Sequence, residues 1–168
     1  SVLNTIYAPQ VLDSKSFEDI EKIASTIAMG EKNNAGKKIY AYALKHGFVD
    51  IPDQSGTNIG TQIIDTAKLE NPELLPRLTL PEESKQRPVF VVMDYAFGEQ
   101  AFECMDELLK PFKKGGKKFP LNIVSVSIMG KAGILEGGKG DIMIPRAHIF
   151  EGTADNYPFK NELKASDI

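Results

Sequence analysis

The chain has 168 residues, of which 42% are hydrophobic and 26% are charged, a balance that suffices for one sizeable core and excludes wholesale disorder. Its formal net charge of −3 argues against a nucleic-acid partner, because general nucleic-acid-binding proteins usually present a basic surface. The one cysteine, Cys104, can form no internal disulfide, which indicates a reducing, cytoplasmic setting. No apolar run approaches the ~20 residues needed to span a bilayer, so we expect no membrane partner.

The first 80 residues are predicted to form a helical N-terminal region. Residues 5–8 are a short apolar stretch that indicates a strand. Apolar residues then recur at helical spacing in three stretches, residues 17–27, 36–46 and 57–69. Gly30 and Gly47 follow the first two of these stretches, where a glycine commonly ends a helix. We therefore expect one short strand and three helices before residue 80.

The second half of the chain has a different pattern, and residues 71–87, which hold three prolines and a charged run, are expected to connect the two halves. Val89–Met93 is a continuous apolar run, as in a strand buried on both faces. A helix is predicted over residues 99–112, with Phe102, Met105, Leu108, Leu109 and Phe112 facing inward. Further strands are predicted over residues 121–128, 142–144 and 147–150, the last two flanking a kink at Pro145.

This order of elements predicts the fold class. A strand, a helix and a second strand joined by a crossover of this length imply a parallel pair. We therefore expect an α/β fold with a layered, mostly parallel or mixed sheet over residues 88–168, joined to the helical N-terminal region of residues 1–80.

A first candidate site follows the strand Val89–Met93. Asp94, Tyr95 and Gly98 lie between this strand and the next helix, and ligands of parallel α/β sheets bind outside the carboxyl ends of the strands. The alternative is a tight strand-to-helix turn in which Glu99 is favoured by the helix dipole. The sequence leaves both interpretations open.

A second candidate site is the glycine-rich segment formed by Gly130, Lys131, Ala132 and Gly133. Glycines let backbone N–H groups approach a ligand closely, and a lysine in such a turn suits an anion such as phosphate. If the neighbouring strands are parallel, Asp94 and Lys131 share one edge of the sheet. Residues 133–139 also fit the pattern G-x-x-x-x-G-K, but Gly140 stands where a P-loop needs Ser or Thr, so we reject that interpretation.

The remaining polar features carry weaker signals. His148 alternates with apolar residues, and we leave open whether it is an ordinary strand histidine or lies beside a ligand. No spacing of Cys, His and Asp indicates a metal site. The basic run from Lys110 to Lys118 is expected to be a solvated loop.

With these residues in view, the second half resembles the nucleoside phosphorylase and nucleosidase superfamily. That family has a strand ending in G-x-A-G-x-L and, after a turn, the pattern G-D-I-x-I-P, which here correspond to residues 130–135 and 140–145. Residues 89–109 resemble the strand, turn and helix that precede this motif, and residues 152–158 resemble the loop that follows it. The resemblance covers about residues 88–168, and the AMP nucleosidases, which carry an extra N-terminal region, are one possible relation.

The resemblance implies an enzyme that cleaves the N-glycosidic bond of a nucleoside or nucleotide, with phosphate or water as the nucleophile. It implies no cofactor beyond phosphate as a co-substrate, a small-molecule nucleoside or nucleotide as partner, and a homo-oligomer. Carried over by position, residues 130–133 would line the region of the sugar, the anion and the base, and Asp141 would hold the turn.

The chain also departs from the family. Lys131 stands where the family often has Ser or Thr, and the family's Met-Glu segment and its acid near the base have no counterpart before Ile168. The chain begins at Ser1 rather than Met. We therefore expect a fragment or a divergent member. Two alternatives stay open: a non-catalytic nucleotide-binding or assembly module of the same fold, and an unrelated α/β protein with a chance motif.

Overall fold

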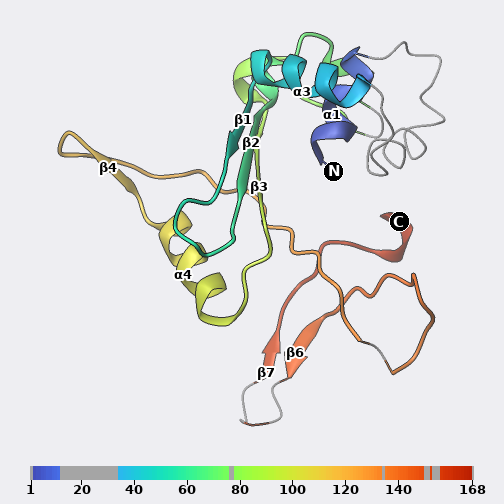
Figure 1. The fold of residues 1–168 in the computed structure, drawn as a ribbon. Helices are drawn as coiled ribbons and strands as arrows, with labels where there is room; N and C mark the ends of the chain where they lie inside the picture. Colours follow the sequence, from blue (N-terminus) through green and yellow to red (C-terminus); the bar gives the residue numbers. More distant parts are fainter. Residues whose placement is uncertain are drawn as a thin grey trace. The chain divides into compact units, whose positions relative to one another are not determined.

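The fold is given by a computed structural model, which describes residues 2–11, 34–75, 78–133, 135–149, 152 and 156–167. The chain divides into two compact units, Ser1–Val126 and Ser127–Ile168. The first unit (Figure 1) contains the helices α1 (Val2–Val11), α3 (Ala35–Lys45) and α4 (Gly98–Leu109), the strands β1 (Phe48–Ile51), β2 (Thr61–Asp65), β3 (Val89–Met93), β4 (Phe112–Lys114) and β5 (Lys117–Phe119), and the 3-10 turns η2 (Thr66–Lys68), η3 (Pro72–Leu74) and η4 (Ser84–Gln86). The second unit contains β6 (Ala147–Ile149), β7 (Asn156–Pro158) and the 3-10 turn η5 (Ala165–Asp167).

The main sheet has the order β1-β2-β3, and both strand pairs are antiparallel. Its register places Phe48 opposite Ile64 and Ile64 opposite Phe90, so these three side chains form one row across the sheet. Because side chains alternate between the two faces of a strand, Val49 and Val91 belong to the other face, where they are exposed. One face of the sheet therefore carries a row of apolar side chains that can pack in a core.

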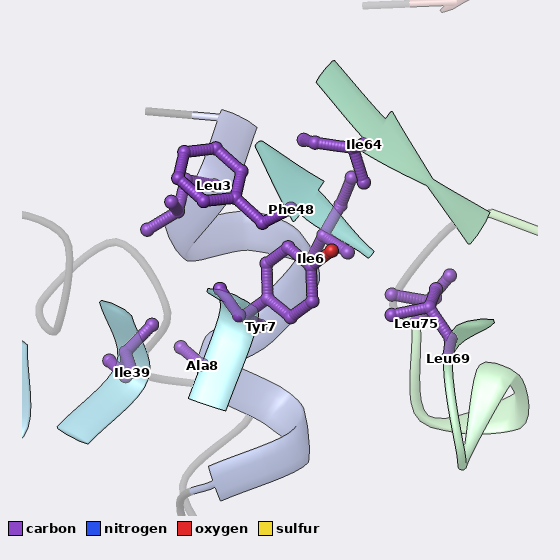
Figure 2. Packing of buried hydrophobic residues seen from close by; sticks show 10 residues of the cluster. Leu3, Ile6, Tyr7, Ala8, Ile39, Phe48, Ile64, Leu69 and Leu75 are labelled. Carbon is purple, nitrogen blue, oxygen red and sulfur yellow. The ribbon is translucent and has the colours of Figure 1, made fainter. Parts of the chain in front are cut away.

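The core lies where α1 and α3 meet that row of the sheet (Figure 1). Its buried side chains, most of them labelled in Figure 2, are Leu3, Ile6, Tyr7, Ala8, Ile39, Ala43, Phe48, Ile64, Leu69 and Leu75. Tyr7 is completely buried, and its hydroxyl donates a hydrogen bond to the carbonyl of His46 at 3.0 Å. Burial, with a smaller contribution from the charge of Asp65, raises the pKa of Tyr7 to about 12. The phenol thus stays neutral and serves as a donor.

Gly47 joins α3 to β1 and explains why the helix ends there. Its φ of +94° is a conformation that only glycine adopts at little cost, as the sequence predicts for a glycine that ends this helix. Its carbonyl accepts a hydrogen bond from the backbone N–H of Asp65 at 2.9 Å, which ties the turn to the end of β2.

Of the four elements predicted for the first 80 residues, three lie within the described residues. The helix over residues 36–46 is confirmed as α3. The strand over residues 5–8 is wrong, because Leu3, Ile6 and Tyr7 share one face of α1 and enter the core. The helix over residues 57–69 is also wrong, since this stretch forms β2 and η2. The helix over residues 17–27 and its cap Gly30 lie outside the described residues.

In the second half, the strand Val89–Met93 and a helix after it are confirmed as β3 and α4. β3 pairs antiparallel with β2, and Val89 and Val91 are exposed, so burial on both faces of a parallel sheet is wrong. α4 ends at Leu109 rather than at residue 112, because a residue before proline disfavours the helical conformation and Pro111 follows Lys110.

The inward positions of α4 need a further correction. Leu108 and Met105 are half-buried, whereas Phe102 is 72% exposed and Leu109 is 66% exposed. Phe112 belongs to β4 and is exposed as well. One side of the apolar surface of α4 therefore faces solvent.

The basic run is a β-hairpin rather than a loop. β4 and β5 pair antiparallel around Gly115 and Gly116, which have φ values of +57° and +76°. Positive φ at both central residues is what a two-residue hairpin turn of type I′ requires, and paired glycines adopt it readily. Every residue of both strands is exposed, so the run is solvated as expected.

Residues 121–128 form no strand, which contradicts the prediction of a parallel partner for β3. Every described residue from 109 to 133 is exposed, so this apolar run has neither a pairing strand nor a packing surface. A strand needs a hydrogen-bonded neighbour to persist, and high β-propensity alone does not supply one. Within the described ranges, all strand pairs are antiparallel, and the fold is mixed α/β with small antiparallel sheets.

The second unit contains the antiparallel hairpin β6–β7. The predicted strand over residues 147–150 is confirmed as β6, whereas residues 142–144 have no regular structure. The N–H of Phe159 donates to the carbonyl of Arg146, and the side-chain amide of Asn161 donates to the carbonyl of Pro145, both at 3.1 Å. These bonds hold the segment after β7 against the start of β6. Of the helices in the described part of the chain, none is long and apolar enough to cross a membrane.

Candidate functional site

The loop between β1 and β2 is organised by the carboxylate of Asp53. One oxygen accepts from the backbone N–H of Ser55 at 2.9 Å, from its hydroxyl at 2.6 Å and from the hydroxyl of Thr57 at 3.3 Å. The other oxygen accepts from the backbone N–H of Asn58 at 2.6 Å. These bonds, that of the Ser55 hydroxyl first, lower the pKa of Asp53 to about 2. Asp53 is therefore an ionised acceptor that shapes the loop, and it is unsuited to act as a base.

The low pKa of Asp53 predicts how the loop responds to acid. Because the folded value of about 2 lies below the ordinary 3.8, the carboxylate stabilises the loop above pH ~4 and loses this effect as the pH falls towards 2. A ¹³C NMR titration of the carboxyl carbon should show a midpoint near 2. Ser55→Ala should move the midpoint upward, and Gln54→Ala should leave it in place. A midpoint at the ordinary value in the unmodified chain would contradict this prediction.

Asp94 closes the same end of the sheet. Its backbone N–H donates to the carbonyl of Gly60 at 3.0 Å, and its Oδ2 accepts from the N–H of Gly60 at 3.0 Å. A Cβ at residue 60 would lie 2.9 Å from Oδ2, so the absence of a side chain there allows this approach. No hydrogen bond among the described residues uses Oδ1 of Asp94. Within those ranges this oxygen has no hydrogen-bond partner and can accept a bond from a ligand.

Tyr95 and Gly98 continue from Asp94 into α4. The rings of Tyr95 and Phe97 meet edge to face at 4.5 Å, and both side chains are more than half exposed. Gly98 has a φ of +52° and begins α4, whose preceding residue makes no side-chain capping bond. A carboxylate oxygen, two aromatic rings and the open end of a helix thus follow one another along the chain. Both the ligand-binding interpretation and the tight-turn interpretation of this segment agree with that geometry.

The glycine-rich segment lies in the second unit. Gly130, Lys131, Ala132 and Gly133 are exposed and have no regular structure. The turn that follows is held by Asp141, whose Oδ2 accepts from the N–H of Gly138 at 2.7 Å. The N–H of Asp141 donates back to the carbonyl of Gly138 at 3.2 Å. The expectation that Asp141 holds this turn is confirmed.

The sheet edge that would have joined the two candidate sites is not formed. Asp94 and Lys131 belong to different units, and residues 121–128 provide no strand beside β3. The predicted neighbourhood of Asp94 and Lys131 depended on that strand. The two candidate sites therefore belong to separate units.

His148 lies in β6, opposite Tyr157 in the register of the hairpin. Its ring stacks on Phe159, with the ring centres 5.0 Å apart and the planes inclined by 19°. The exposed imidazole is therefore fixed in orientation by an aromatic neighbour, as for an ordinary strand histidine. Its role beside a ligand stays a prediction.

A cluster of polar and aromatic side chains around Glu70 was not predicted from the sequence. Its carboxylate accepts from the hydroxyl of Tyr42 at 3.1 Å and lies 3.7 Å from Nδ1 of His46. The ring of Tyr42, in the last turn of α3, stacks on that of His46, the residue that follows the helix, at 3.9 Å. The four-residue spacing of Tyr42 and His46 can be read from the sequence. Glu70 comes 28 residues after Tyr42, and only the fold brings its carboxylate to the two rings. Within the described ranges, no group of three or more His, Cys, Asp or Glu side chains could hold a metal ion.

The described residues define a mixed α/β protein with small antiparallel sheets and with exposed polar loops at the end of the main sheet. The chain belongs to a family of unknown function (DUF6909), whose model matches residues 26–168. No curated protein and no solved structure matches the chain.

Proposed function

We propose that this protein binds a nucleoside or nucleotide and serves the cleavage of its N-glycosidic bond, by phosphorolysis or hydrolysis, in the cytoplasm. The observation that carries the proposal is the arrangement after β3. Among the described residues Oδ1 of Asp94 has no hydrogen-bond partner, so it can accept from sugar hydroxyls, and the exposed rings of Tyr95 and Phe97 offer faces on which a base can stack.

The second unit supports the proposal through chemistry of its own. The glycine-rich segment is exposed, and Lys131 within it carries a positive charge that suits the phosphate of a nucleotide or a free phosphate. The carboxylate of Asp141 is bonded to the N–H of Gly138, and the backbone N–H groups of the exposed segment before it offer donors for the same anion. In the proposed reaction, such N–H groups and Lys131 would stabilise an anion, and phosphate would be a co-substrate rather than a cofactor. A layered fold of the phosphorylase type belongs to the same proposal.

A second candidate is a non-catalytic nucleotide-binding or assembly module. Exposure of every described residue from 109 to 133 favours it, because bond cleavage profits from preorganised groups in a site that excludes water. The two candidates differ in one measurement, the release of free base.

The test combines binding and turnover. AMP, adenosine, inosine and uridine are titrated calorimetrically into the chain, and base release is followed with and without phosphate. Lys131→Ala should weaken binding of AMP by ~10-fold or more, because a hydrogen bond to a charged group contributes ~1.5–3 kcal/mol. Thermal stability should stay nearly constant, since the side chain is exposed.

Lys164→Ala, an exposed lysine of the same unit, is the matched control and should bind AMP like the unmodified chain. Asp94→Asn keeps an acceptor for Gly60 and should weaken adenosine binding. Base release supports the enzyme, whereas nucleotide binding without release supports the module. Absence of binding by the unmodified chain would remove both candidates.

A further inference from the structure

The hairpin β4–β5 concentrates positive charge that the chain itself does not neutralise. Its register sets Lys113 opposite Lys118 and Lys114 opposite Lys117, and like charges directly opposite each other destabilise a strand pair. None of the four lysines forms an ion pair with a carboxylate of the described residues. A partner with negative charge would relieve this repulsion.

One face of the hairpin combines charge with aromatic surface. Because side chains alternate along a strand, the opposed pair Phe112 and Phe119 shares a face with Lys114 and Lys117. The two phenylalanines are 58% and 47% exposed. This face therefore suits a surface that places carboxylates beside apolar side chains.

The helix α4, which immediately precedes the hairpin (Figure 1), presents such a surface. Glu99 and Glu103 are neighbours one turn apart, and like charges at this spacing destabilise a helix. Phe102, three residues after Glu99 and exposed, lies beside them, and Leu109 continues the apolar strip. Asp106 and Glu107 are already paired with Lys110 at 2.5 and 2.7 Å, but no ion pair within the described ranges reaches Glu99 or Glu103.

The dimensions of the two surfaces agree. Residues one turn apart on a helix are separated by ~6 Å along its axis. Cross-strand neighbours in a hairpin are ~5 Å apart. Lys114 and Lys117 can thus face Glu99 and Glu103 while the aromatic side chains of the hairpin meet Phe102. Only Lys110 and Pro111 separate the hairpin from the end of α4, and among the described residues no ion pair joins its lysines to Glu99 or Glu103 of the same chain. A connection this short disfavours folding of the hairpin back onto the helix that precedes it.

We propose that the hairpin of one copy docks on the Glu99–Phe102–Glu103 stripe of a second copy, and that the reciprocal contact completes a two-fold dimer. Each chain carries both halves of the contact, as a self-complementary two-fold interface requires. A nucleic acid is the less favoured occupant, since the acidic stripe of α4 and the net charge of −3 would repel it.

The test is an exchange of charges, read by sedimentation velocity at low salt. Lys114→Glu/Lys117→Glu reverses the hairpin, and Glu99→Lys/Glu103→Lys reverses the stripe. Each variant alone should self-associate at least ~10-fold more weakly than the unmodified chain, because both contacts become repulsive. An equimolar mixture of the two should recover the dimer, since both contacts are then attractive again. High salt should weaken the dimer of the unmodified chain.

Lys37→Glu/Lys38→Glu on α3 is the matched control and should dimerise like the unmodified chain. Circular dichroism checks that α4 persists, and recovery in the mixture shows that both variants are folded. The proposal is overturned if the unmodified chain is monomeric at ~0.1 mM, if the hairpin variant still dimerises, or if the mixture stays monomeric. A monomer that binds a single-stranded oligonucleotide through the hairpin lysines would assign that surface to nucleic acid instead.

Discussion

Gly47→Ala is expected to lower the free energy of unfolding by ~2–5 kcal/mol, from left-handed backbone strain and from overpacking together. Gly47 has a φ of +94°, and a Cβ at this position would lie 2.5 Å from the carbonyl oxygen of Asp65 and 3.1 Å from Cβ of Lys68. The nearer atom belongs to the backbone, and the same turn is tied to β2 by the bond from Asp65 to Gly47. Relief of the clash would therefore have to move the junction of α3, β1 and β2.

Gly56→Ala is the matched control for this prediction. Gly56 has a similar φ of +84°, but a Cβ there would meet nothing within 4 Å. It should lower the free energy of unfolding by only the backbone strain, ~1–2 kcal/mol. Urea denaturation of both variants isolates the steric contribution as the difference between them. Equal destabilisation would mean that the contact with Asp65 plays no part.

Phe48→Ala should lower the free energy of unfolding by ~3–5 kcal/mol, the cost of removing a large buried aromatic side chain and leaving a cavity. Phe48 is 2% exposed and begins β1. Its ring meets Tyr7 edge to face at 6.3 Å and Tyr40 at 5.7 Å, so it joins α1, α3 and the sheet. The transition midpoint in urea should fall accordingly.

Val49→Ala provides the comparison, because Val49 is the next residue of β1 and points to the opposite face, where it is 49% exposed. Its loss should cost less than ~1 kcal/mol, a difference in strand propensity alone. If the two variants were equally stable, the core would not depend on this face of the sheet.

Elements are predicted correctly from the sequence where local signals and tertiary packing agree. The apolar spacing on α3 and Gly47 after it predicted a helix and its end, and both are present. The helix predicted over residues 57–69 is wrong, because Ile63 and Ile64 fit a helical period as well as a strand, and pairing with β1 and β3 favours the strand. The parallel partner predicted at residues 121–128 failed for a related reason, since propensity does not supply a neighbouring strand.

In the candidate site too, some features follow from local signals in the sequence and others depend on residues far apart in the chain. Asp94 was predicted from its place between a strand and a helix, but Gly60, which holds it, lies 34 residues earlier and has no local signal. The loop of Asp53 carries a readable pattern, since Asp, Ser, Thr and Asn side chains bond to nearby backbone in turns. The loop was not recognised from the sequence, because the helix predicted over residues 57–69 included Thr57 and Asn58.

By itself, the sequence determined the positions of α3, β3, α4 and β6, the end of α3 at Gly47 and the basic character of residues 110–118, because neighbouring residues produce these features. Only the tertiary structure decided the antiparallel order of the sheet, the burial of Tyr7 beneath α3 and the bond between Gly60 and Asp94. Those features join residues far apart in the chain. Their stability depends on which surfaces meet, and no local pattern of residues specifies that.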